Sequence, residues 1–186
     1  PVSFASEEFL KKVEDRIIIP TVKGLQIENL PYKGFIFIGL IMVDNDPYVI
    51  EYNVRMGDPE TQVVLPRIKS DFLELMVRTA SQALNNFDLQ TYDDAYANIV
   101  MVAGGYPESY EKGNSITGIP KDNETSKIFH AGTKEIDNKL FTNGGRVLSV
   151  VSKGSDFKQA LSKSYEIAEK IDFKDKNYRK DIGFDL

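Results

Sequence analysis

Apolar residues in the first part of the chain recur first with the spacing of a helix and then as an unbroken run. A helix is predicted over residues 6–27, because apolar residues recur every four positions among charged neighbours: Phe9, Val13 and Ile17. Pro20 is expected to kink or interrupt this helix, since proline has no backbone N–H to continue the hydrogen-bond ladder. The run over 34–43 is apolar apart from its glycines, and it predicts a strand that is buried on both faces.

Turn residues separate this strand from the next elements. The sequence Asp-Asn-Asp-Pro at 44–47 is typical of a turn, and a second strand is predicted from Tyr48, so the two strands form an antiparallel hairpin. A later helix is predicted from a cap at Ser70 to about Leu84. Its inner stripe is expected to consist of Phe72, Leu73, Met76, Ala80 and Leu84.

The second half of the chain contains strands and one more helix. Strands are predicted over 97–103, 127–130, 139–141 and 145–151, with Asn143-Gly144 as the turn between the last two. The polar interval 108–126 is expected to be an exposed loop or ribbon. A final helix is predicted from Ser155, and one face carries Phe157, Leu161, Tyr165, Ala168 and Ile171. The order of these elements is typical of an α+β fold.

Composition limits the class of protein and the kind of metal site. With 41% hydrophobic and 27% charged residues, the chain has enough apolar material for a packed core. Its net charge of -5 argues against a nucleic-acid partner, and no apolar stretch approaches a membrane span. Cysteine is absent and there is one histidine, so a metal must be held by oxygen ligands, which favours magnesium or manganese.

The strand that starts at Tyr48 carries the most informative polar residues. Side chains alternate between the two faces of a strand, so Glu51, Asn53 and Arg55 are expected to point the same way. The opposite face is expected to be core, and it consists of Tyr48, Ile50, Tyr52 and Val54.

The polar face is suited to a metal-bound phosphate chain. Residues two apart on a strand lie roughly 6.6 Å apart, so Glu51 and Asn53 can share one or two bridged cations. Arg55 then faces the anion that the metal holds, an arrangement that suits phosphoryl transfer. The glycine and turn residues at 57–60 allow the backbone to fold close to a ligand. A half-exposed strand in water, followed by an ordinary tight turn, fits the same residues.

Five segments of the chain are similar to one enzyme family. The stretch VIEYNVRMGDPETQ at 49–62 closely resembles the NxRxGDPExQ motif of glycinamide ribonucleotide synthetases. Four more segments resemble that family in the same order: GGYP at 104–107, HAGT at 130–133, TNGGRVL at 142–148 and RKDIG at 179–183. The resemblance extends over nearly the whole chain from about Glu14.

The resemblance implies a fold and a set of site residues. Residues 1–90 are expected to form the inner lobe of an ATP-grasp domain, which binds metal and phosphate. Residues 91–186 are expected to form a small carboxy-terminal α+β domain of mostly antiparallel strands. The resemblance assigns the roles as follows: Glu51 and Asn53 are metal ligands, Arg55 and Asp58 are catalytic, and Glu60 and Arg146 bind substrate.

The family reaction joins glycine to 5-phosphoribosylamine in purine biosynthesis. ATP, bound with magnesium or manganese, is expected to activate glycine as glycyl phosphate, which the amine then attacks. The expected partners are these small molecules and the amino-terminal domains of the same cytoplasmic protein, with no nucleic acid and no membrane. Because the lobe that clamps adenine is outside the chain, residues 1–186 alone are expected to be inactive.

Some positions leave other interpretations open. Several ATP-grasp relatives carry an acidic metal ligand about a dozen residues before the Glu51–Asn53 pair, whereas this chain has Gly39 there. His130 and Tyr106 lie in family-like segments, although a structural role is the simpler expectation for both. The alternative functions are another ATP-grasp ligase and a non-catalytic structural or binding domain.

Overall fold

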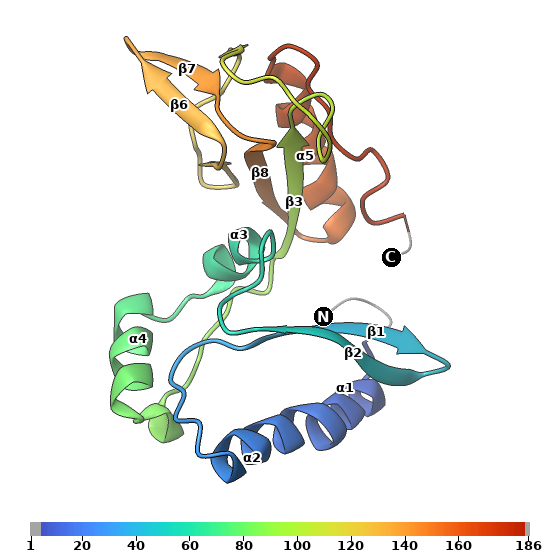
Figure 1. Cartoon of the computed structure of the whole chain (residues 1–186), viewed down its shortest axis with the longest axis vertical. Helices are drawn as coiled ribbons and strands as arrows, with labels where there is room; N and C mark the ends of the chain where they lie inside the picture. The colour runs from blue at the N-terminus through green and yellow to red at the C-terminus, as the bar shows by residue number, and fades with distance from the viewer. Residues whose placement is uncertain (1–4, 185–186) are drawn as a thin grey trace. The chain divides into compact units, whose positions relative to one another are not determined.

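The computed structural model describes residues 5–184, which divide into two units (Figure 1). Within the described residues, the first unit takes 5–57 and 70–89, and the second takes 58–69 and 90–184. No helix among residues 5–184 is long and apolar enough to cross a membrane.

The first unit begins with a helix that changes its winding in the middle. The α-helix α1 (Glu7–Val13) is followed by a π-helical turn, η1 (Glu14–Ile18), and by the α-helix α2 (Ile19–Ile27). Ser6 caps α1 by accepting a hydrogen bond from the Phe9 backbone N–H, and the helix begins where the apolar spacing predicts. Pro20 lies in the first turn of α2, directly after the wider π turn, so the expected interruption falls just before the proline.

A β-hairpin follows the helix. Strands β1 (Phe37–Val43) and β2 (Asp46–Asn53) pair antiparallel, which confirms the predicted hairpin. Asp44 and Asn45 both have left-handed φ angles, 51° and 63°, as a type I′ turn requires. Lys12 and Arg16 of the helix contact the Asp46 carboxylate at 3.2 and 2.9 Å (α1 lies beside the hairpin in Figure 1). The hydrogen bond from Lys12, followed by the charge of Arg16, lowers the pKa of Asp46.

The burial predicted for this hairpin is wrong. The β1 residues are half-buried or exposed, and Ile50 and Val54, expected in the core, are 66% and 72% exposed. Tyr52 contacts the helix through a 2.9 Å hydrogen bond between its hydroxyl and Thr21 Oγ1. The described residues supply two strands to this sheet, and so small a sheet lacks the neighbours that bury both faces.

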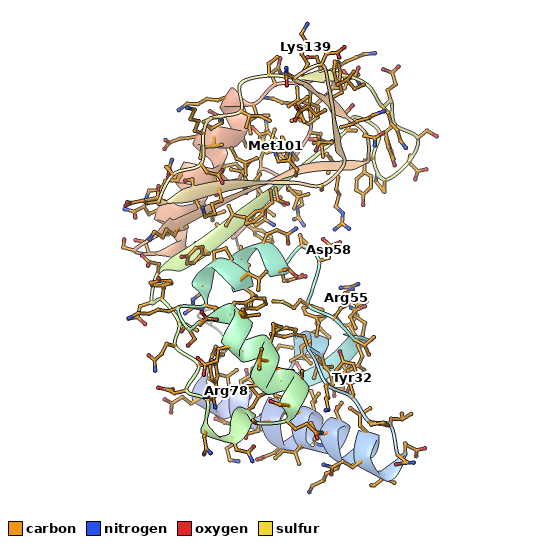
Figure 2. All side chains as sticks on the ribbon, turned by 90° about the vertical axis from the view of Figure 1, so that its left-hand side faces the viewer. Tyr32, Arg55, Asp58, Arg78, Met101 and Lys139 are labelled. Atoms are coloured by element: carbon orange, nitrogen blue, oxygen red, sulfur yellow. The ribbon has the colours of Figure 1, made fainter. Side chains whose placement is uncertain are left out.

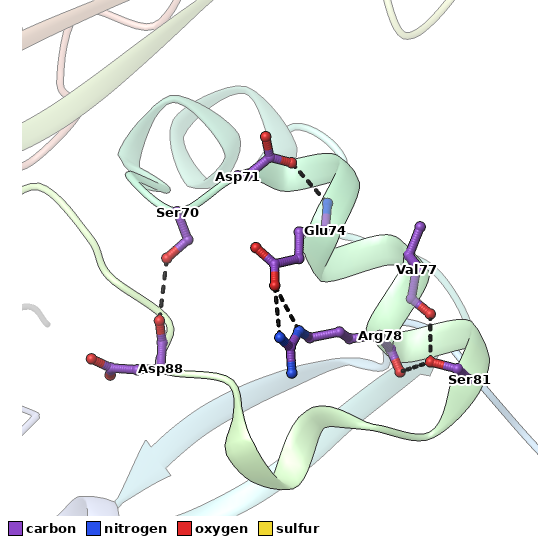
Figure 3. Close-up of polar contacts among 7 residues, drawn as sticks. All are labelled: Ser70, Asp71, Glu74, Val77, Arg78, Ser81 and Asp88. Atoms are coloured by element: carbon purple, nitrogen blue, oxygen red, sulfur yellow. Dashed lines mark hydrogen bonds and ion pairs between the residues drawn. The ribbon is translucent and has the colours of Figure 1, made fainter.

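The next helix uses a different cap and a different face from those predicted. Helix α4 (Phe72–Ser81) is capped by Asp71, whose side chain accepts from the Glu74 N–H, while Ser70 Oγ donates to the Asp88 carbonyl (Figure 3). The buried residue is Leu75, whereas Leu73 is 72% exposed. Of the expected stripe, Phe72, Ala80 and Leu84 are also exposed, and only Met76 is half-buried. Apolar residues occupy more than one side of this helix, so spacing alone does not select the buried side.

The second unit is built on a three-stranded antiparallel sheet. Its strands are β3 (Ala95–Val102), β8 (Arg146–Gly154) and β5 (Ser126–His130), with β8 in the centre. Helix α5 (Phe157–Lys170) contacts β3 and β8 (Figure 1), and Met101 of β3 is fully buried (Figure 2). The core side chains are at most 7% exposed: Ile99, Met101, Ala103, Ile116, Val147, Leu148, Val150, Ala168, Ile171 and Phe173.

A second three-stranded sheet lies in the same unit. It consists of β4 (Ser115–Ile116), β7 (Lys139–Thr142) and β6 (Thr133–Ile136), and β6 was not predicted. The turn predicted at Asn143-Gly144 between paired strands is wrong, because β7 and β8 belong to different sheets. Neither residue has the left-handed φ of a type I′ turn, whereas Asp137 and Asn138, between β6 and β7, have φ angles of 49° and 57°.

Helix α5 packs on the sheet through small residues, and a side chain caps each of its ends. Its cap is Asp156 rather than Ser155, and Ala160, Ser164 and Ala168 are fully buried. Ser164 Oγ donates to the Ala97 carbonyl of β3 at 3.1 Å, which satisfies a buried hydroxyl. Two short helical segments, α3 (Thr61–Val64) and η2 (Leu65–Arg67), also belong to the second unit. A third, η3 (Leu84–Asn86), belongs to the first unit.

Lys176 caps the carboxy-terminal end of α5, and its removal tests this part of the fold. Its ammonium donates to the carbonyls of Ala168, at 3.3 Å, Glu169, at 3.0 Å, and Ile171. Lys176→Met keeps the apolar stem but leaves these carbonyls without their cation, so we expect the free energy of unfolding to fall by about 1–2 kcal/mol. Urea unfolding followed by circular dichroism measures this change. Lys174→Met, which removes only an exposed ion pair with Glu111, is the control, and equal losses in both variants would contradict the assignment.

Candidate functional site

The polar residues predicted on β2 form a hydrogen-bonded row. Asn53 Nδ2 donates to Glu51 Oε1 at 2.9 Å, and Arg55 Nη2 donates to Asn53 Oδ1 at 3.2 Å. Arg55 follows the end of β2, where Figure 2 labels it, and its Nη1 donates to the Met56 carbonyl at 2.9 Å. The structure therefore brings Glu51, Asn53 and Arg55 together on one side of the strand.

A β-bulge and a glycine shape the start of this row. Gly39 pairs with Glu51 and Leu40 pairs with Val49, which leaves Ile50 as the extra residue of the bulge. A Cβ atom at position 39 would lie 3.0 Å from Glu51 Cγ. Gly39 thus lies directly opposite Glu51 and leaves room for its side chain.

The donor set of the row fits a hard cation that keeps other ligands. Glu51 is exposed and Asn53 is half-buried, and together they offer a carboxylate and an amide oxygen. Magnesium and manganese prefer such oxygens, and magnesium usually completes its shell with water and phosphate oxygens. No group of three or more His, Cys, Asp or Glu side chains among residues 5–184 could hold a metal. A carboxylate and an amide oxygen on their own leave coordination positions for water or phosphate oxygens.

Arg55 offers positive charge beside these oxygens. Within the described part of its own unit, the guanidinium forms no ion pair with a carboxylate, and it donates to a carbonyl and to an amide oxygen. A guanidinium without a carboxylate partner is available to a phosphate, which it can contact through two parallel hydrogen bonds.

Asp58 and Arg146 form a separate pair in the second unit. Arg146 Nη1 donates to Asp58 Oδ1 at 3.1 Å and Nη2 donates to Oδ2 at 2.6 Å, although the two residues are 88 positions apart. Arg146 begins β8, and Asp58 (labelled in Figure 2) precedes α3. The sequence motifs identify each residue as a candidate, but nothing in the sequence indicates that the two side chains are in contact.

The other candidate residues make local contacts. Glu60 is exposed, and its carbonyl accepts from the backbone N–H groups of Val63 and Val64 at the start of α3. His130 Nδ1 and Thr133 Oγ1 lie 3.1 Å apart, across the turn between β5 and β6.

Three of the family-like segments meet at one end of the main sheet of the second unit. The Ala103 N–H donates to the Gly145 carbonyl, and the Gly132 N–H donates to the Arg146 carbonyl, both at 2.8 Å. A Cβ atom on Gly132 would lie 2.6 Å from the Gly144 Cα, so these backbones contact each other directly. The segments around 104–107, 130–133 and 142–148 therefore form one continuous, glycine-rich edge next to Arg146.

The chain matches two parts of one protein family. The family described as "Phosphoribosylglycinamide synthetase, C domain" matches residues 96–185, and "Phosphoribosylglycinamide synthetase, ATP-grasp (A) domain" matches residues 1–61. The phosphoribosylamine-glycine ligase of Fusobacterium nucleatum is 44% identical over 186 residues, covering 98% of this chain and 44% of that protein.

Further relatives and a solved structure agree with these matches. The bifunctional purine biosynthetic protein of Pichia angusta is 45% identical over 185 residues, which cover 98% of this chain and 23% of that protein. The crystal structure of the phosphoribosylamine-glycine ligase of Thermotoga maritima has a TM-score of 0.79 and 39% identity, over 92% of this chain and 42% of that chain. The chain thus spans less than half the length of these relatives.

The matched segments define the class of protein as an ATP-grasp enzyme with a C domain, of α+β architecture. The chain belongs to the phosphoribosylglycinamide synthetase family, and it matches that family's C domain and part of its ATP-grasp (A) domain. This confirms the family and the fold class predicted from the sequence.

The Tyr106 ring requires glycine at position 145, which can be tested by substitution and rescue. A Cβ atom on Gly145 would overlap the Tyr106 ring, so Gly145→Ala is expected to lower the free energy of unfolding by about 1–3 kcal/mol. Adding Tyr106→Ala should recover part of this loss, as measured in urea. Gly24→Ala is the control, because its methyl group meets no atom within 4 Å. An unchanged stability of Gly145→Ala would contradict the contact.

Proposed function

We propose that this chain supplies the metal- and phosphate-binding residues and the C domain of a ligase that joins glycine to 5-phosphoribosylamine. The observation that carries the proposal is the row of Glu51, Asn53 and Arg55, in which a carboxylate and an amide that could bind a metal lie beside a guanidinium. The names of the matched relatives, phosphoribosylamine-glycine ligases, supply the substrates. Because the chain is a portion of such proteins, residues 1–186 alone are not expected to carry out the reaction.

Glu51 and Asn53 would hold a magnesium or manganese ion that accompanies ATP. When bound, such an ion neutralises the negative charge of the phosphate chain and of the group being transferred. Glu51 would contribute charge, and Asn53 would contribute its neutral oxygen once the amide, whose nitrogen donates to Glu51 in this structure, has turned. The two side chains leave coordination positions for phosphate oxygens.

Arg55 would bind the transferred phosphoryl group. A free carboxylate is a poor acyl donor because its leaving group would be oxide, whereas an acyl phosphate releases phosphate. A guanidinium at the transferred group stabilises the charge on its oxygens. Exclusion of water protects the acyl phosphate from hydrolysis until the amine attacks.

Residues of the second unit would serve the other substrates. Arg146 lies at the glycine-rich edge and would contact an anionic substrate group through the guanidinium N–H groups that do not bind Asp58. Glu60, an exposed residue of the motif at 49–62, would also bind substrate. Asp58 belongs to the catalytic motif, and because both of its oxygens accept hydrogen bonds from Arg146, it would act through that arginine.

We further propose a division near residue 90 between the lobe that binds metal and phosphate and the C domain. The family matches to residues 1–61 and 96–185 support it. Residues 58–69 precede this boundary yet pack with the second unit. A cytoplasmic location is proposed because charged, phosphorylated substrates do not cross membranes unaided.

Glu51→Gln in the full-length ligase tests the metal assignment. The substitution keeps the shape of the side chain but removes its charge, so we expect kcat to fall at least about 100-fold while the fold is retained. Release of ADP that depends on both glycine and 5-phosphoribosylamine measures the activity, and circular dichroism measures the fold. Glu28→Gln, at an exposed glutamate outside the row, is the matched control.

Two results would contradict the proposal. Turnover near that of the unsubstituted ligase in Glu51→Gln would remove Glu51 from the metal site. ADP release by the unsubstituted ligase that does not require glycine or 5-phosphoribosylamine would instead favour another ATP-grasp ligase with a different acid or amine.

A further inference from the structure

The segment that directly follows Arg55 is bonded to the second unit. Residues 58–69 cluster with 90–184, and hydrogen bonds attach them near both ends of the segment. Asn98 Nδ2 donates to the Pro59 carbonyl and the Tyr96 hydroxyl donates to the Pro66 carbonyl, both at 3.1 Å. Further along, the Lys69 N–H donates to the Gln90 carbonyl at 2.9 Å.

The pair of Asp58 and Arg146 is the first of these attachments along the chain. Only Met56 and Gly57 separate Arg55 from Asp58, so the anchored segment begins within three residues of the phosphate-facing guanidinium. The bidentate geometry fixes both the distance and the orientation of the Asp58 carboxylate, which a single contact would not do.

The arginine side of the pair is held by the core of the second unit. Arg146 begins the central strand β8, and its carbonyl accepts from the Gly132 N–H at 2.8 Å. The next two residues, Val147 and Leu148, are 0% exposed. The guanidinium therefore extends from a rigid point, whereas Asp58 lies in an irregular segment that needs such an attachment.

We propose that Asp58 is a positioning residue for phosphoryl transfer, which it serves by fastening the segment after Arg55 to the C domain through Arg146. The fastening limits the backbone conformations open to residues 55–57, and so limits where the Arg55 guanidinium can lie. The proposal rests on the function proposed above. It assigns Asp58 no contact with a reacting atom, because both of its oxygens already accept from Arg146.

Conservative substitutions in the full-length ligase test this assignment. Asp58→Asn and Arg146→Lys each remove the bidentate charge pair while keeping a polar side chain. Because an exposed ion pair of this kind shifts a local equilibrium by about fivefold, we expect amide hydrogen exchange over residues 56–62 to rise about fivefold. For Asp58→Asn we also expect kcat to fall by a similar factor, with less than about a twofold change in KM for glycine, because Asp58 itself contacts no substrate.

A charge reversal separates positioning from a direct role. The double variant Asp58→Arg with Arg146→Asp restores the pair in the opposite sense, so it should recover part of the lost kcat and the slow exchange. The control is Asp181→Asn, which breaks another exposed bidentate pair of the second unit, Arg179 to Asp181 at 2.9 and 2.7 Å. This control should leave kcat and exchange over residues 56–62 unchanged.

The outcomes distinguish this proposal from the proposed function. If exchange rises in Asp58→Asn but kcat stays the same, the pair is only structural and the positioning role is wrong. If kcat falls while exchange over residues 56–62 is unchanged and the reversal recovers nothing, Asp58 acts directly and the proposal is also wrong. In both cases an active unsubstituted ligase and an inactive Glu51→Gln variant would leave the proposed function intact.

Discussion

The position of Glu51, Asn53 and Arg55 on one side of β2 is the constraint on which the proposed chemistry depends. The Asn53 amide accepts from the guanidinium with its oxygen and donates to the carboxylate with its nitrogen, so it orders the row from positive to negative charge. A cation at the Glu51 end and an anion at the Arg55 end would each meet the opposite charge. A phosphate chain that carries a metal ion presents that same order of charges.

The second unit combines a rigid core with an unusually close-packed edge. Its central strand β8 is buried along most of its length, and α5 covers the sheet with small residues. At the end of β8 where Arg146 lies, glycines allow three backbone segments to contact each other. Arg146 therefore extends from a part of the fold with little freedom to move, which suits both the substrate contact and the attachment of Asp58 that we propose.

Local patterns in the sequence were enough to predict the elements that depend on local physics. The first helix, the hairpin around Asp44-Asn45 and the row of polar residues on β2 follow from apolar spacing, from turn residues and from the alternation of a strand. Motif resemblance supplied the family. From the alternation, the position of Glu51, Asn53 and Arg55 on one side of the strand was predicted correctly.

The features that were missed depend on partners distant in the sequence. Burial of β1 requires neighbouring strands, and the described chain gives its sheet only β2. The dipeptide Asn143-Gly144 has the composition of a hairpin turn but joins strands of two different sheets. The bond between Asp58 and Arg146 crosses 88 positions, so no spacing rule indicates it. Among the candidate residues, only a structure shows which ones pair.

The most direct test of the central claim is anomalous diffraction from crystals of the full-length ligase with Mn²⁺ and a non-hydrolysable ATP analogue. The account predicts a manganese peak at roughly 2.0–2.2 Å from oxygens of both Glu51 and Asn53, with Arg55 on the terminal phosphate. Manganese bound elsewhere, with Glu51, Asn53 and Arg55 still bonded only to one another, would contradict it.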